Sequence, residues 1–340
     1  MPPLFETAVV IGKFYPPHRG HKHLIDTACE QAKHVTVICC CRQGEVPAGN
    51  LRAEWLSQIH PGVTVLTVED TYPPDDSALW ARLTIGWLGV APAAVFTSEA
   101  YGDDYARHLG AVHVAVDPAR RRFPCSGTGI RNDPLRHWDC LEPCVRAHYV
   151  KRVCVVGAES SGTTTLTQQL ADHYQTVWVP EYGREFTERY RSFGGADWRS
   201  EDFLTIAEEQ LRREDDLALE ANRILFCDTD ALATSIWHER YVGRVSDEVL
   251  RIGLGRRYDL YLVTDVDIPF VQDGYRDGEH LRTAMHRRFV DELSRLDRPF
   301  AVIGGSRDER LSKAVSLIDE RVLAPRIQGD GTLTHDSAKT

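Results

Sequence analysis

Lysine is scarce in this sequence: only six of the 40 lysine and arginine residues are lysine. Wherever a side-chain cation must bind phosphate, we therefore expect arginine. Basic residues are also outnumbered, and the net charge of −10 argues against broad electrostatic attraction to nucleic acid or to an anionic membrane. We expect neither as a partner.

Long hydrophobic runs are absent as well. No apolar stretch approaches the 18 or more residues that a membrane-spanning helix needs, and no segment has the pattern of a secretory signal. The nine cysteines are an odd number, which is typical of a reducing compartment. Cys140 and Cys144 have the spacing of metal ligands, but no second pair completes a zinc site. We predict a cytoplasmic protein without structural zinc.

Short, valine-rich apolar runs alternate with longer amphipathic segments along the chain, which is typical of buried parallel strands joined by helices. The predicted strands are 8–11, 35–40, 63–68, 95–97, 112–116, 153–156, 224–227, 260–263 and 300–303, and the helices of the first half are 21–33, 51–59, 79–88 and 101–109. This rhythm predicts the α/β class, with two doubly wound parallel-sheet domains at residues 1–146 and 147–324. A polar, aperiodic flexible tail is predicted at 325–340.

The first candidate site follows the first predicted strand, in the segment Gly12-Lys13-Phe14-Tyr15-Pro16-Pro17-His18-Arg19-Gly20-His21. A helix is predicted to begin here, and helix N-termini in such sheets bind anions. The three-residue spacing sets His18 and His21 on one side of that helix, and Gly20 lets a phosphate approach the backbone. The alternative is that both histidines only cap or pack the helix.

A second phosphate-binding segment, Cys125-Ser126-Gly127-Thr128-Gly129-Ile130-Arg131, follows the fifth predicted strand. Together the two segments resemble the nucleotidyltransferase superfamily, which pairs an H-x-G-H motif with a later S-x-T-x-I-R motif, and within it the nicotinamide mononucleotide adenylyltransferases. The resemblance implies catalytic roles for His18, His21 and Arg131. It implies an ATP site formed by Gly12, Lys13, Phe14, His18, His21, Ser126, Thr128 and Arg131.

The second candidate site is a glycine loop between a strand and a helix, Gly157-Ala158-Glu159-Ser160-Ser161-Gly162-Thr163-Thr164. This is the order of a P-loop, whose backbone amides bind phosphates, but Thr163 stands where a P-loop normally has lysine. The predicted ATP-binding residues are Gly157, Glu159, Ser160, Ser161, Gly162, Thr163, Thr164 and Thr165. A purely structural glycine turn is the alternative.

Acidic residues after two further strands complete this predicted site. Asp228 and Asp230 follow the predicted strand 224–227, at its carboxyl end. A carboxylate there would share Mg²⁺ with the hydroxyl of Thr164. An Asp-x-Asp segment at this place is also a common helix cap. Glu181 begins the segment Glu181-Tyr182-Gly183-Arg184-Glu185-Phe186. Either Glu181 or Asp228 is the candidate base that accepts a substrate hydroxyl proton.

The order of the two sites, the E-Y-G-R-E-F segment, the D-T-D strand end and residues 267–276 resemble the bifunctional NadR-type proteins, without their N-terminal DNA-binding domain. The resemblance implies a Rossmann-like nucleotidyltransferase domain followed by a P-loop kinase domain. The kinase would phosphorylate ribosylnicotinamide to nicotinamide mononucleotide, and the first domain would join this to adenylate, giving NAD and pyrophosphate. ATP with Mg²⁺, both nicotinamide compounds and NAD are the implied ligands.

The missing lysine requires another cation at the second site. Arg184, Arg276 and Arg282 lie in segments expected to face the phosphates, with Tyr182 beside the substrate. Two alternatives remain at this stage: the second domain is a non-catalytic sensor of ATP or NAD, or the first domain acts on another phosphorylated substrate. The sequence does not fix the oligomeric state, and a homo-oligomer is compatible with it.

Overall fold

The computed structural model describes residues 3–190, 198–272 and 278–324. The described chain divides into two compact units, one ending at Val145 and the other beginning at Arg146. Each unit contains one five-stranded parallel sheet, so the predicted α/β fold with two parallel sheets is confirmed. The predicted tail at 325–340 lies outside the described residues. No described helix is both long enough and apolar enough to cross a membrane.

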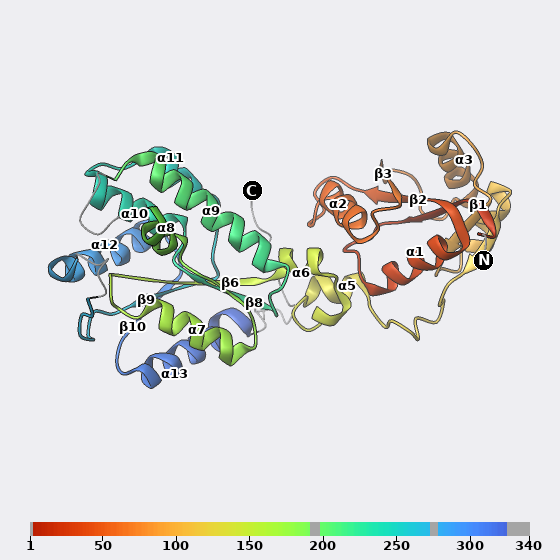
Figure 1. Ribbon diagram of the computed structural model, residues 1–340. Coiled ribbons are helices and arrows are strands. Elements are labelled where there is room, and N and C mark those ends of the chain that lie inside the picture. The colour runs from red at the N-terminus through yellow and green to blue at the C-terminus, as the bar shows by residue number, and fades with distance from the viewer. Residues whose placement is uncertain (1–2, 191–197, 273–277, 325–340) are drawn as a thin grey trace. The chain divides into compact units, whose positions relative to one another are not determined.

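The first unit alternates strands and helices from its start (Figure 1). Its elements are β1 (Phe5–Gly12), α1 (Arg19–Gln31), β2 (Ala32–Cys41), α2 (Gly49–Ile59), β3 (Thr64–Glu69), α3 (Ser77–Leu88), β4 (Ala94–Thr97), α4 (Gly102–Leu109), β5 (Val112–Ala115), α5 (Gly127–Asn132), the 3₁₀ helix η1 (Trp138–Cys140) and α6 (Pro143–Tyr149). The strand order is β3-β2-β1-β4-β5. The chain therefore winds first to one side of β1 and then to the other, and a site is expected at the carboxyl ends of β1 and β4.

Alternating side chains of β1 supply both faces of this sheet. Val10 faces a core that includes Leu24 and Ile25 of α1, whereas Val9 faces a core that includes Ala81 of α3 and Tyr105 of α4. Because both faces are buried, the strands are continuous apolar runs, as predicted. Helix α1 spans 19–31, whereas the prediction was 21–33, so it begins and ends two residues earlier. Strand β2 begins directly after it without a connecting loop.

The second unit repeats the pattern with a different strand order. Its elements are β6 (Lys151–Gly157), α7 (Thr163–Tyr174), β7 (Trp178–Val179), α8 (Tyr182–Tyr190), α9 (Ser200–Ala218), β8 (Ile224–Asp228), α10 (Ala231–Val242), α11 (Asp247–Gly255), β9 (Leu260–Thr264), the 3₁₀ helix η2 (Glu279–Leu281), α12 (Arg282–Arg295), β10 (Phe300–Ile303), α13 (Arg307–Ile318) and the π-helical turn η3 (Asp319–Leu323). The strands are ordered β10-β9-β6-β8-β7.

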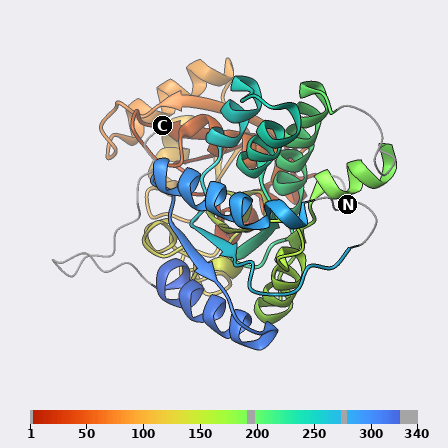
Figure 2. The same cartoon turned by 90° about the vertical axis from the view of Figure 1, so that its left-hand side faces the viewer.

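Helices cover both faces of this second sheet. Leu166 and Leu170 of α7 pack with Ile318 of α13 against Val155 and Leu262 of the strands. Helices α9, α10 and α12 lie on the opposite face, and α12 and α13 are seen on either side of the sheet in Figure 2. The central strand β6 ends where the glycine loop begins, between β8 and β9. The loop therefore lies at the switch point of the strand order, where ligands bind in such sheets.

Candidate functional site

The two histidines of the first site lie together at the N-terminus of α1. His18 is the N-cap, and its Nδ1 accepts the backbone N–H of His21 at 3.4 Å. The two imidazole rings stack with 3.7 Å between their centroids, and Phe14 contacts the ring of His21 edge-on. A side chain at Gly20 would bring its Cβ within 3.1 Å of the His18 ring. His18 caps the helix while its ring stacks on that of His21 beside the switch point, so capping and ligand binding are compatible.

Burial keeps both imidazoles neutral. Burial, together with the positive charge of Arg120, lowers the pKa of His18 to about 4. The pKa of His21 is also lowered, by burial first and then by His18 and Arg120. Within the described chain, the buried Nδ1 of His21 has no hydrogen-bond partner. A buried polar atom of this kind at a helix N-terminus fits an incoming ligand.

The second motif converges on the first through Tyr15. Arg131 of α5 donates from Nη1 to the carbonyl oxygen of Tyr15 at 2.5 Å and from Nη2 to Thr128 Oγ1 at 3.2 Å. Its guanidinium carbon lies 4.2 Å from the centroid of the Tyr15 ring. Ser126 caps α5 by accepting the N–H of Gly129 at 3.4 Å. Residues more than a hundred positions apart in the sequence thus form one site.

Tyr15 and Arg52 are site residues that sequence reasoning missed. Arg52, fully buried in α2, donates to the carbonyl oxygen of Lys13, and its guanidinium lies 4.8 Å from the Tyr15 ring centroid. The ring of Tyr15 therefore contacts two guanidinium groups. Lys13 forms an ion pair with the buried carboxylate of Asp70 at 3.2 Å. Tyr15 could have been found from its place inside the motif, but Arg52 carries no motif of its own.

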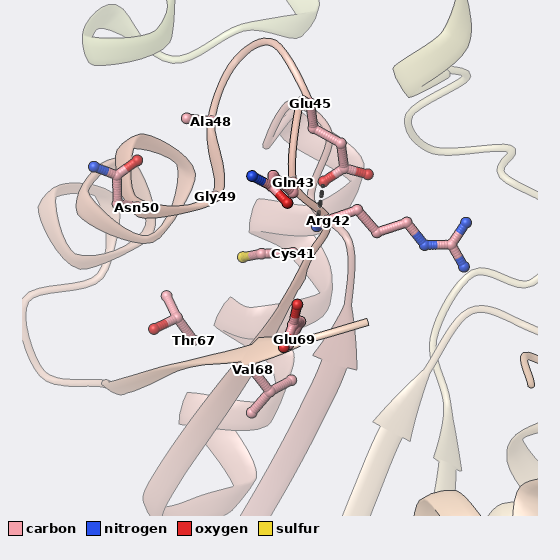
Figure 3. Close-up of a pocket in the computed structure, with 11 residues that line it drawn as sticks. Cys41, Arg42, Gln43, Glu45, Ala48, Gly49, Asn50, Thr67, Val68 and Glu69 are labelled. Carbon is pink, nitrogen blue, oxygen red and sulfur yellow. Dashed lines mark hydrogen bonds between the residues drawn. The ribbon is translucent and has the colours of Figure 1, made fainter. Parts of the chain in front are cut away.

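A cavity of about 430 Å³ lies at the carboxyl ends of β2 and β3 (Figure 3). It is lined by Cys41, Arg42, Gln43, Gly44, Glu45, Ala48, Gly49, Asn50, Thr67, Val68 and Glu69. Glu45 accepts the backbone N–H of Arg42 at 3.0 Å and forms an ion pair with Arg52. The lining is therefore connected, through Arg52, to the loop that carries the histidines.

The cysteines of the first unit include one disulfide that the sequence did not predict. Cys125, directly before Ser126, is bonded to Cys140 of η1, so Cys140 does not pair with Cys144 as a metal site would require. Among the residues that the structure describes, no group of three or more histidine, cysteine, aspartate or glutamate side chains is placed to hold a metal. The disulfide closes the segment that contains Ser126, Thr128 and Arg131.

The glycine loop of the second unit has the geometry of a phosphate-binding loop. Gly162 has φ +89°, a left-handed conformation that favours glycine, and α7 begins at the next residue. Thr164 donates its hydroxyl to Asp228 Oδ2 at 2.5 Å. Burial raises the pKa of Asp228 to about 6, opposed by hydroxyl hydrogen bonds from Thr164 and Thr163. Asp228 Oδ1 is buried and has no partner in the described residues, which fits a further ligand there.

Asp230 is a helix cap, which corrects its prediction as a metal ligand. One carboxylate oxygen accepts the backbone N–H of Ala233 at 2.8 Å, and the other accepts the Tyr261 hydroxyl at 2.7 Å. The side chain is 1% exposed and is the N-cap of α10. Both oxygens are committed to these structural contacts, so only Asp228 of the two aspartates fits a site beside the loop.

Three arginines hold three consecutive residues of the glycine loop. Arg240 of α10 forms an ion pair with Glu159 at 2.9 Å. Arg282, the first residue of α12, donates to the carbonyl oxygen of Ser160 at 3.2 Å, and Arg310 of α13 donates to that of Ser161 at 2.5 Å. Arg240 and Arg310 were not predicted, because no motif marks them.

Of the three arginines predicted to replace the lysine, the structure places Arg282 at the loop. It also donates to the carbonyl oxygen of Ile268 at 3.0 Å, and its Nε is buried without a partner in the described chain. Arg184 forms an ion pair with Glu188 along α8 at 2.5 Å. Arg276 lies outside the described residues.

Of the remaining predicted residues of the second site, some pack in the interior and others lie in or beside the glycine loop. Tyr182 is buried under the guanidinium of Arg213, 4.4 Å from its ring centroid, and so packs α8 against α9. Glu181 directly precedes α8 and is partly buried. The Ser161 hydroxyl bonds Thr264 Oγ1 at 2.6 Å inside the core. Gly157 is the last residue of β6, whereas Ser160 lies in the loop and Thr163 and Thr165 lie in the first turn of α7. Ser160 Oγ accepts the N–H of Val271 at 2.8 Å.

This geometry defines an α/β nucleotide-binding protein of two compact units, with a loop that leads into a helix N-terminus at the switch point of each sheet. A family model described as an AAA domain matches residues 152–310. The "Trifunctional NAD biosynthesis/regulator protein NadR" of Salmonella typhimurium (strain LT2) is 30% identical over 339 residues, covering 92% of this chain and 82% of that protein. The protein of the same description from Escherichia coli (strain K12) is 31% identical over 295 residues, covering 79% of this chain and 71% of that protein. The chain belongs to the NadR family, as its sequence motifs predicted.

Two solved structures share the fold along nearly the whole chain. A crystal structure of a NadR protein in complex with NAD and AMP-PNP superposes with a TM-score of 0.73 at 20% identity, covering 95% of this chain and 98% of that one. A NadR protein in complex with NR gives a TM-score of 0.75, also at 20% identity, covering 93% of this chain and 96% of that one. At this identity, the two structures support the fold.

Proposed function

We propose that this protein makes NAD in two consecutive reactions: the second domain phosphorylates ribosylnicotinamide, and the first domain adenylylates the resulting mononucleotide. The observation that carries the proposal is the convergence of Arg131 on the loop that bears His18 and His21. The relatives are named for NAD biosynthesis, and related structures contain NAD, AMP-PNP and NR. ATP is the co-substrate of both reactions.

In the first reaction, a phosphate oxygen of nicotinamide mononucleotide attacks the α-phosphorus of ATP. A new P–O bond forms, the bond from the α-phosphorus to the bridging oxygen breaks, and pyrophosphate leaves. The nucleophile is already ionised at neutral pH, so no general base is needed. The neutral imidazoles of His18 and His21 donate hydrogen bonds to phosphate oxygens, and Arg131 adds positive charge.

In the second reaction, the ribose 5′-hydroxyl attacks the γ-phosphorus of ATP, and ADP leaves. We assign the base to Glu181 because Asp228 is 1% exposed and already accepts the Thr164 hydroxyl. The backbone amides of the glycine loop bind the phosphates. Arg282 supplies the cation that Thr163 lacks, because it alone of the three predicted arginines contacts the loop in the described residues.

Magnesium fits the residues beside the glycine loop. The unpartnered Oδ1 of Asp228 and the adjacent Thr164 hydroxyl are oxygen ligands of the kind that Mg²⁺ takes. When bound, the ion would neutralise charge on the phosphate oxygens of ATP. Thr164 and Asp228 would hold it, and Asp230 would keep its structural role at α10.

The variant His21→Ala tests the first reaction. Loss of one charge-stabilising donor is expected to lower adenylyl transfer from ATP to nicotinamide mononucleotide by about 10²-fold or more. The matched control is His34→Ala, because His34 is exposed near the start of β2, at the opposite end of the strand from the site. Equal rates for the two variants would overturn the assignment.

The second reaction is tested with the full chain, ribosylnicotinamide, ATP and Mg²⁺, by measuring the sum of mononucleotide and NAD formed. Product is the expected result. Tight ATP binding without product at high protein concentration would instead favour the sensor alternative for the second domain. In a separate assay of adenylyl transfer to nicotinamide mononucleotide, competition with other phosphorylated acceptors, such as pantetheine phosphate, tests the alternative substrate of the first domain.

A further inference from the structure

Arg240 and Glu159 form a bracket at the glycine loop that no motif predicted as a unit. Arg240 Nη1 donates to Glu159 Oε1 at 2.9 Å, and Glu159 Oε2 accepts the backbone N–H of Gly278 at 2.8 Å. The guanidinium of Arg240 also lies over the rings of Trp237 and Tyr241, at 5.4 Å and 4.4 Å from their centroids. We call this set the Arg240–Glu159–Gly278 bracket.

The bracket is well packed. The side chains of Arg240 and Glu159 are 10% and 15% exposed, and the Tyr241 hydroxyl donates a further hydrogen bond to Glu159 Oε1 at 3.3 Å. A Cβ at Gly278 would lie 2.8 Å from Glu159 Oε2, so a larger residue there would displace the Glu159 carboxylate. A carboxylate on a phosphate-binding loop would repel ATP, and the ion pair with Arg240 neutralises that charge in advance.

The bracket also fixes the start of α12. Gly278 directly precedes η2, and η2 leads into α12, whose first residue is Arg282. Arg282 in turn donates to the Ser160 carbonyl, one residue after Glu159. The glycine loop and the start of α12 are thus held together at two points, and one of them is the cation proposed to replace the lysine.

We infer that Arg240 is a positioning residue for phosphoryl transfer: through Glu159 and Gly278, it sets the place of Arg282 relative to the glycine loop. This inference rests on the proposed kinase activity. A P-loop with its own lysine carries its cation on the loop, whereas here the cation comes from another helix. The distance between that helix and the loop therefore becomes a determinant of the rate.

The test is a double-mutant cycle in the full chain, with phosphorylation of ribosylnicotinamide by ATP as the assay. Arg240→Met is expected to lower kcat by about 10-fold or more, since a small misplacement of a catalytic group has an effect of this size. In the background of Arg282→Met, the substitution Arg240→Met should lower kcat by less than about 3-fold, because the effects of substituting coupled residues are not additive. Additive losses would overturn the inference, and so would an unchanged rate for Arg240→Met.

Three further variants separate positioning from folding. Arg251→Met removes an exposed arginine that pairs with Glu248 on α11, and it should change neither kcat nor the melting temperature. Arg240→Lys keeps the charge beside Glu159 and should recover part of kcat. Thr163→Lys places a cation on the loop itself. In that background, Arg240→Met should lower kcat by a smaller factor than it does in the natural chain. If Arg240→Met lowers kcat by the same factor with the natural loop and with the Thr163→Lys loop, the role of Arg240 is merely structural and the inference is overturned.

The failure of the proposed function would be seen separately. If the natural chain forms no mononucleotide or NAD from ribosylnicotinamide, the kinase proposal fails before any variant is compared. If the natural chain is active and the cycle is additive, the kinase proposal stands and the positioning role of Arg240 is wrong.

Discussion

The imidazole of His18 holds its proton weakly, because burial and the charge of Arg120 lower its pKa from 6.5 to about 4. The folded state therefore favours the neutral ring. This contribution to stability is complete above pH 6.5 and is lost as the pH falls toward 4. We expect the ring signals of His18 in an NMR titration to stay constant from pH 8 to about pH 5.

The variant His18→Gln identifies these signals by their loss. Adenylyl transfer should correspondingly show no loss of rate from protonation of His18 between about pH 6 and pH 8. A titration midpoint near 6.5 would contradict the buried, neutral pair and would require a charged imidazole in the mechanism.

Residue types could be predicted at these sites where a motif fixes both the chemistry and the spacing, as for His18, His21 and Arg131. Arg52 could not be predicted, because it acts through stacking on Tyr15 and a hydrogen bond to a backbone carbonyl, for which the sequence has no signature. Asp230, by contrast, was predicted as a metal ligand, but its contacts in the structure are those of a helix cap. Its place after a strand suits a metal ligand and a helix cap equally, and only the observed contacts to Ala233 and Tyr261 distinguish them.

At the scale of elements, α5 illustrates how closely two motifs must approach to form one site. A Cβ at Gly127 would lie 2.5 Å from the carbonyl oxygen of Tyr15, a backbone atom that cannot yield easily. Gly127→Ala is therefore expected to push α5 away from the histidine loop and to break the Arg131–Tyr15 hydrogen bond. We expect adenylyl transfer to fall by about 10²-fold, as for other displacements of this size.

Gly86→Ala is the matched control, because a Cβ at Gly86 in α3 would contact nothing within 4 Å. Alanine in a helix interior should stabilise the first domain by roughly 0.5–1 kcal/mol and leave the rate unchanged. Thermal unfolding and the adenylyl-transfer rate together test both variants. Equal behaviour of the two variants would show that the approach of α5 to Tyr15 does not limit the reaction.

The elements themselves were largely predictable, because buried parallel strands are continuous apolar runs and the sequence contains nine of them in the expected rhythm. The boundaries of these helices and strands were less predictable. Helix α1 ends at Gln31 and β2 begins at Ala32, a transition without a turn signal. The strand β7 has only two residues and relies on pairing with β8, which tertiary structure provides and local sequence does not.

At the scale of the whole molecule, the chain combines two units with separate cores, and each carries its own candidate site at the loop after its central strand. In the proposed sequence of reactions, the product of the second unit is the substrate of the first. Since every identified contact at each loop comes from its own unit, a substitution at one site is not expected to disturb the other.

This independence is tested by two variants assayed separately and together. Asp228→Asn keeps the size of the side chain but removes its charge, and it should abolish most mononucleotide formation while leaving adenylyl transfer to supplied mononucleotide unchanged. His21→Ala should do the reverse and accumulate mononucleotide from ribosylnicotinamide. Mixing the two variants should restore NAD formation, because free mononucleotide made by one variant can be adenylylated by the other. Loss of both half-reactions in either variant would show that the two sites are coupled, and failure of the mixture alone would show that the mononucleotide must pass between sites of the same molecule.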